Sequence, residues 1–139
     1  MKKLILFGLV AAVAGGSASL TAQSAAPAAR NAPVVYARDI APILASTCAT
    51  CHVTGAEAGR MALVPRRAIA SLVNVASVEV PALKRVVPGR PERSYLMMKL
   101  EGTHVRNGGT GARMPFGAPP LSAERIGLFR RWIAQGAKP

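Results

Sequence analysis

The sequence predicts a single all-α domain. Its 139 residues suffice for one hydrophobic core, and a content of 50% apolar and 17% charged residues excludes a disordered polyelectrolyte. Three segments combine helical periodicity with residues that begin or end helices. Aromatic residues make up only 4% of the chain. A bound group could therefore fill part of the core, although a small Ala-rich helical domain could also form with few large side chains.

Residues 1–23 are predicted to form a secretory signal peptide. Lys2 and Lys3 precede an apolar run over residues 4–14, and small residues follow. A membrane span needs about 20 predominantly apolar residues, so this run favours a cleaved signal over an uncleaved anchor, which remains the alternative. We therefore expect a periplasmic protein without a stable membrane span.

Residues 24–33 predict a flexible lead, because they consist mainly of Ala, Pro and Ser. The folded domain is expected over residues 34–139. Its first helix is predicted over 40–48, with Asp39 as the cap before it. Asp39 can accept hydrogen bonds from the free amides at its start, and the apolar residues at 40, 43 and 44 share one face.

The middle of the domain carries weaker signals. A short helix is predicted over 68–74. The β-branched segment that follows, 75–87, is interrupted by Pro81 and is expected to be irregular or briefly extended. A further helix is predicted over 91–101, because proline suits its first position and Gly102 supplies a stop.

The C-terminal part predicts a long loop and then the clearest helix of the chain. Residues 104–120 are rich in Gly and Pro and predict a loop. Ser122 can cap the last helix, whose apolar residues at 126, 129 and 133 recur at helical spacing. Gly136 is expected to end it.

The basic excess of the chain favours acidic partners. Lys and Arg number 18 against six Asp and Glu, giving a formal net charge of +12. Docking to an acidic protein face, attraction to anionic lipid and a solvated surface without a partner all remain open. No nucleic-acid partner is expected, because the protein is predicted to be exported and its basic residues are scattered without interleaved aromatics.

Residues 48–52 form the motif C-x-x-C-H, the sequence signal for covalent c-type haem attachment. At the end of a helix, Cys48 and Cys51 project to the same side and can form thioethers with the two vinyl groups of one porphyrin. The adjacent His52 can then direct its imidazole at the iron. Both cysteines of the chain lie in this motif, which predicts one covalently attached haem c.

Two other interpretations of the motif were weighed. A thioredoxin-like redox pair is expected after a strand, whereas the segment before Cys48 is predicted to be helical. A zinc site could use Cys48, Cys51, His52 and His104, but adjacent ligands such as Cys51 and His52 suit one tetrahedron poorly. A small metal-binding module without haem remains an alternative.

The second axial ligand of a haem iron has five candidates. Met114 is the preferred one, because it precedes Pro115 in a Gly- and Pro-rich loop that can wrap the far face of the ring. Flexible thioether side chains on a helix usually fill the core, and a histidine in a loop is usually solvated. The alternative candidates for this ligand are Met61, Met97, Met98 and His104.

Together these features resemble a class I c-type cytochrome, and most closely the planctomycete-type mono-haem cytochrome c domain. Besides the C-x-x-C-H motif and Met114-Pro115, the similar segments are 40–44, 87–91 with Ser94, and 132–137. The resemblance covers residues 34–137.

The resemblance implies a cytochrome c-like fold: several short helices around one covalently bound haem, with the N- and C-terminal helices packed together. It implies His52 and Met114 as axial ligands of the iron, and the carbonyl of Pro65 as acceptor for the other ring N–H of His52. For the haem propionates, the candidate partners are Arg60, Arg106 and Arg113.

Two axial side chains leave no open position on the iron, which suits transfer of single electrons between redox partners in the periplasm. We therefore expect an electron-transfer protein and not an enzyme, acting as a free carrier or as a subunit of an oxidoreductase complex. If Met114 does not bind, a five-coordinate haem sensor or a peroxidase-like protein is the alternative.

Overall fold

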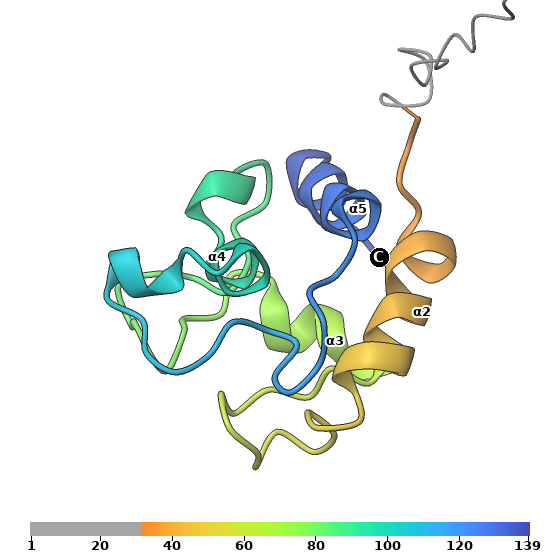
Figure 1. The fold of residues 1–139 in the computed structure, drawn as a ribbon. Helices are drawn as coiled ribbons and strands as arrows, with labels where there is room; N and C mark the ends of the chain where they lie inside the picture. The colour runs from red at the N-terminus through yellow and green to blue at the C-terminus, as the bar shows by residue number, and fades with distance from the viewer. Residues whose placement is uncertain (1–31) are drawn as a thin grey trace, which may run out of the picture. The chain divides into compact units, whose positions relative to one another are not determined.

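The computed structural model of the chain describes residues 32–139 (Figure 1). The expected signal peptide, 1–23, and most of the expected flexible lead lie outside the described residues. Within them the secondary structure is helical. The only extended pairing in these residues is three isolated β-bridges, and none of them is part of a strand. The all-α prediction is therefore confirmed for this part of the chain.

The first helical run starts four residues earlier than predicted. It consists of η1 (Tyr36–Ile40), α2 (Ala41–Ile43) and η2 (Leu44–Cys48), of which the outer two have wider π-helical turns. The carboxylate of Asp39 accepts the N–H of Val35 at 2.8 Å. Asp39 thus satisfies a free amide from inside the first turn, and not from the position before the helix.

Helix α3 (Pro65–Leu72) starts three residues earlier and ends two residues earlier than predicted, with proline at the first position. Proline is tolerated there because its missing N–H has no partner in a first turn. After α3 the chain forms short bridges between Val73 and Val86 and between Ala76 and Lys84. The expectation of a briefly extended segment over 75–87 is confirmed.

The predicted helix 91–101 is divided into η3 (Pro91–Arg93) and α4 (Tyr95–Glu101). Ser94 separates them with an extended backbone. Its hydroxyl donates to the Arg90 carbonyl and accepts the N–H of Val87, both at 2.9 Å. These bonds fix the break, which helical periodicity alone cannot reveal.

The end of the chain agrees with its local signals. Gly102 ends α4 at a φ of 76°, and only the short η4 (His104–Asn107) interrupts the following loop. The hydroxyl of Ser122 accepts the N–H of Arg125 at 3.3 Å and caps α5 (Ala123–Ala134). The predicted start of the last helix is confirmed.

Helix α5 contacts both α4 and η1 and carries the largest buried side chains. Trp132 and Phe129 are each about 1% exposed. The rings of Trp132 and Tyr36 lie 5.8 Å apart between centroids, a distance typical of favourable aromatic pairs. The first and last helical segments are therefore in direct contact (Figure 1).

Replacing Trp132 by alanine should lower the free energy of unfolding by about 3–5 kcal/mol, because it leaves a large void in the core. It also removes the hydrogen bond from the indole N–H to the Lys138 carbonyl at 2.8 Å. Denaturant titration measures the effect. Phe116→Ala is the control, since Phe116 is 76% exposed and its loss should change stability by less than about 0.5 kcal/mol. Equal effects of the two variants would contradict this description of the core.

Candidate functional site

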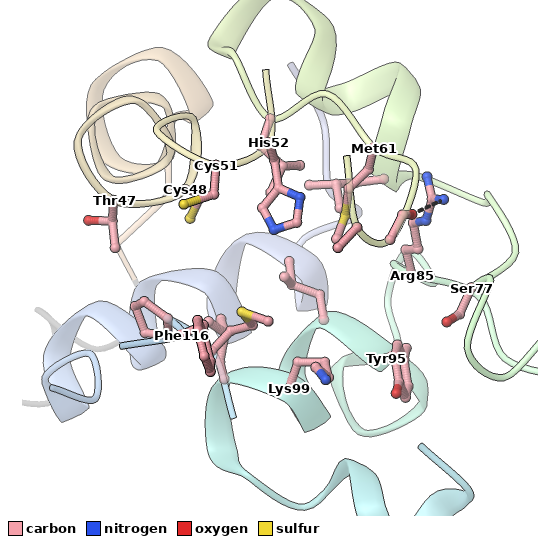
Figure 2. A pocket seen from close by; sticks show the side chains of 18 of the residues that line it. Thr47, Cys48, Cys51, His52, Met61, Ser77, Arg85, Tyr95, Lys99 and Phe116 are labelled. Carbon is pink, nitrogen blue, oxygen red and sulfur yellow. Dashed lines mark hydrogen bonds between the residues drawn. The ribbon is translucent and has the colours of Figure 1, made fainter. Parts of the chain in front are cut away.

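A cavity of about 520 Å³ opens between the end of η2, helix α4 and the loop that precedes α5. All four predicted site residues line it: Cys48, Cys51, His52 and Met114. Figure 2 shows the labelled Cys48, Cys51 and His52 side chains directed into the same space, with Tyr95 and Lys99 of α4 across from them. The fold thus brings the C-x-x-C-H motif and Met114 to one cavity from distant parts of the sequence.

Backbone hydrogen bonds at the end of η2 determine how the motif faces the cavity. The N–H of Ala49 donates to the Leu44 carbonyl at 2.8 Å, and the N–H groups of Cys51 and His52 donate to the Cys48 carbonyl at 3.2 and 3.0 Å. The chain therefore makes one more turn after the helix. This turn brings both thiols and the imidazole to the cavity (Figure 2).

The two thiols do not form a disulfide, and their environments differ. Cys48 is half-buried and Cys51 is exposed. Burial, with a smaller contribution from Cys51, raises the pKa of the Cys48 thiol to about 11. Cys48 is therefore a neutral thiol at pH 7, and it is not an activated nucleophile of the kind that catalytic cysteines require.

One ring nitrogen of the His52 imidazole is free of hydrogen bonds within residues 32–139. Its Nδ1 is buried and has no partner among residues 32–139. Burial lowers the pKa of His52, although the charge of Glu57 and the Ala58 backbone act in the opposite direction. The side chain is therefore neutral at pH 7, and neutral imidazole is the form that binds metal ions.

The role expected for Pro65 is wrong. Its carbonyl accepts the hydroxyl of Tyr36 at 2.6 Å, and the described residues provide no hydrogen bond between it and His52. Tyr36 of η1 reaches this carbonyl from a separate segment, a contact that the sequence does not indicate.

Met61 and Met114 are the two methionines in the cavity wall, and different segments hold them. The Cε atom of Met61 and the Cε1 atom of His52 both lie within 4 Å of the place where a Cβ on Gly59 would be, at 2.9 and 3.9 Å. Met61 therefore shares the wall of His52. The N–H of Met114 instead donates to the Lys99 carbonyl at 3.0 Å, which holds Met114 beside α4.

The remaining candidate ligands are in the core. Met97 and Met98 are buried and do not line the cavity, as expected for core methionines. The expectation of a solvated His104 is wrong, since this side chain is only 2% exposed. Its Nε2–H donates to the Gly111 carbonyl at 3.0 Å. The ring is buried because it packs beneath the glycine-rich loop that follows it.

Arg85 supplies a buried positive charge at one edge of the cavity. It is 7% exposed and donates to three backbone carbonyls: Ser71 at 2.7 Å, Gly59 at 2.8 Å and Arg60 at 3.0 Å. Burial lowers its pKa. No carboxylate within residues 32–139 forms an ion pair with it. Such a cation can pair with an anionic group of a ligand.

The three arginines predicted to meet the haem propionates, Arg60, Arg106 and Arg113, do not line the cavity. Arg85 was missed because it lies in a Val-rich segment without a recognisable motif. The available signal was a pair of adjacent basic residues, Lys84 and Arg85, within a mainly apolar segment.

In addition to Arg85, the cavity wall contains a cluster of three polar side chains, Glu79, Tyr95 and Lys99, which the sequence did not reveal. The hydroxyl of Tyr95 donates to the carboxylate of Glu79, and the ammonium of Lys99 lies 3.4 Å from that carboxylate. Burial, followed by the hydrogen bond to Glu79, raises the pKa of Tyr95. The i, i+4 spacing of Tyr95 and Lys99 on a helix places them on one face, but Glu79 comes from a separate segment.

The zinc alternative lacks an assembled site. Within residues 32–139, no three His, Cys, Asp or Glu side chains are grouped so that they could hold a metal ion. His104, which that alternative requires, is absent from the cavity lining. Cys48, Cys51 and His52 therefore have no fourth ligand of this kind.

Comparison of the chain with protein-family models, curated proteins and solved structures finds no match. Across residues 32–139, none of the helices has the length and apolar character needed to cross a membrane. The function is therefore inferred from the side chains of the cavity. Its volume lies within the roughly 300–1,000 Å³ of typical cofactor sites. A pair of thiols, a neutral imidazole, a thioether and a buried guanidinium on its walls fit a haem.

Proposed function

We propose that this chain is a mono-haem c-type cytochrome, which carries single electrons between redox partners in the periplasm. The supporting observation is the convergence of Cys48, Cys51, His52 and Met114 on one cavity. Cys48 and Cys51 would hold one haem c through two thioethers, and His52 and Met114 would be the axial ligands of its iron.

The residues of this site favour electron transfer over catalysis at the iron. Bound haem would supply a one-electron ferric/ferrous couple. Lys99, whose carbonyl accepts the N–H of Met114, lies across the cavity from His52 (Figure 2), so His52 and Met114 could together occupy both axial positions and exclude water. A thioether ligand and apolar walls both favour the reduced state and raise the potential.

Arg85 would orient the group within the cavity. Haem is largely apolar, but it carries two carboxylates on one edge, and an unpaired anion in an apolar cavity is unfavourable. Arg85 has a buried guanidinium without an ion-pair partner in the described residues. We therefore propose that the carboxylate edge faces Arg85, and not the three arginines suggested by the sequence.

The surface charge supports docking to an acidic face of a redox partner. Of the six acidic residues in the chain, four already form ion pairs with its own Arg and Lys side chains. Arg106, Arg113 and Arg125, which flank Met114 in the sequence, are exposed. Association through such a surface should weaken as salt increases.

The haem assignment is tested by expressing the chain together with a cytochrome c maturation system. The intact mass of the purified protein should equal that of the processed chain plus one haem, because a thiol adds to a vinyl group without losing atoms. The haem should also stay with the polypeptide during acid extraction. A folded protein with an unmodified mass would refute the proposed function.

A further inference from the structure

The segment that carries Met114 has little conformational preference of its own. Three glycines precede Met114 in this loop, and Gly108 and Gly111 have φ angles of 83° and 68°. Glycine loses more conformational freedom on folding than any other residue. Contacts from outside the loop must therefore determine where the thioether of Met114 lies.

One ion pair holds both backbone groups of Thr110, in the middle of this loop. The carboxylate of Glu79 accepts the N–H of Thr110 at 3.4 Å, and the ammonium of Lys99 donates to its carbonyl at 3.0 Å. The two side chains are themselves 3.4 Å apart. Because both its N–H and its carbonyl are bound, Thr110 cannot shift without breaking these contacts.

Lys99 also connects Thr110 directly to Met114. Its side chain holds the Thr110 carbonyl, and its backbone carbonyl accepts the N–H of Met114 at 3.0 Å. The Tyr95 hydroxyl donates to Glu79 and holds the carboxylate against α4. The position of Met114 is thus linked to the same two side chains, Glu79 and Lys99.

The Glu79–Lys99 ion pair is buried enough that breaking it should weaken its hold on the loop. The Lys99 side chain is only 10% exposed, and removing one partner of such a pair leaves the other charge without compensation. Burial raises the pKa of Glu79, but the hydrogen bonds from Tyr95, Thr110 and Lys99 and the charge of Lys99 together lower it by more. Glu79 is therefore ionised at pH 7.

We propose that Glu79 and Lys99 are positioning residues for Met114: they hold loop 108–114 so that the thioether faces His52 across the cavity. This inference rests on the proposed function for the ligand role of Met114. Neither residue would touch the iron. Their effect would be to keep the methionine ligand in place against competing ligands.

The test compares Glu79→Gln with Glu101→Gln. Glu101 lies on α4 and pairs with Arg130 of α5, and its side chain is 29% exposed against 31% for Glu79. Both variants lose one paired carboxylate, but only Glu79 contacts the loop. In oxidised, haem-bearing protein, Glu79→Gln should weaken the absorption band of iron bonded to methionine sulfur. It should also increase the apparent affinity for added imidazole about tenfold, because a smaller fraction of molecules has Met114 in place.

A second readout does not depend on haem. Hydrogen exchange at the Thr110 and Met114 amides, which bond to Glu79 and to Lys99, should be about tenfold faster in Glu79→Gln than in Glu101→Gln, since the loop opens more easily. Lys99→Leu, which removes the Lys99 charge from the same ion pair without adding a possible iron ligand, should give the same shifts. It provides the test if Glu79→Gln does not fold.

Equal exchange and equal imidazole affinity in the Glu79→Gln and Glu101→Gln variants would overturn the inference, even if the wild type has the methionine band. If the wild type carries no haem, the proposed function fails, and with it the ligand role of Met114. Faster loop exchange alone would then show a structural role and not the positioning role proposed here.

Discussion

A variant with both Cys48 and Cys51 replaced by alanine should contain no covalently attached haem, whereas the wild type should contain one per chain. Both thiols line the cavity and are free of a disulfide. They are also the two cysteines of the whole sequence, so no other thiol can form a thioether. The mass of the double variant should therefore equal that of the polypeptide alone. Any haem bound by His52 and Met114 should be lost on acid extraction.

Single variants separate the contributions of the two cysteines. Cys48→Ala and Cys51→Ala should each keep one thioether, and each should leave one vinyl group unreacted, which shifts the haem absorption relative to the wild type. Thr50→Ala is the matched control, because Thr50 lies between the two cysteines and is exposed. It should retain haem as the wild type does. Haem that resists extraction in the double variant would show that attachment uses other chemistry.

The features that were predictable from the sequence depend on residues close together in the chain. The spacing within C-x-x-C-H is local, so the position of its side chains follows from one turn after a helix. The Ser122 cap is local as well, and it was located correctly. The apolar spacing of the last helix indicated the buried face that contains Phe129 and Ile133.

The differences arose where a particular hydrogen bond or loop conformation, which no sequence signal marks, decides the structure. The early start of the first helix depends on Asp39 accepting the N–H of Val35, and neither Val35 nor Tyr36 carries a helix-start signal. His104 was expected in solvent because it lies among glycines. Its burial depends on how the following loop folds over it.

The site shows the same division. The cysteines, His52 and Met114 belong to recognisable motifs and were found from the sequence. Arg85 and Glu79 were not, because their importance comes from burial and from partners in other segments. A buried guanidinium that bonds only to backbone carbonyls cannot be distinguished in a sequence from an arginine on the surface.

Replacing Met114 by alanine should leave haem attached but open one axial position. Exogenous imidazole should then bind at least about a hundredfold more tightly, because no side chain competes for the iron. The reduction potential should fall by on the order of 0.1 V, within the roughly 0.8 V range that axial ligands span. The absorption band of iron bonded to methionine sulfur should disappear from the oxidised protein.

Met61→Ala is the control for this prediction, since it removes the same side chain from the same cavity. Met61 lies beside His52 against Gly59, so it cannot reach the face of a haem opposite His52. Its loss should leave the methionine band intact. If Met61→Ala abolished the band and Met114→Ala did not, the ligand assignment would be reversed. A wild type without the band would instead favour the five-coordinate sensor or peroxidase, because a vacant position is what those functions require.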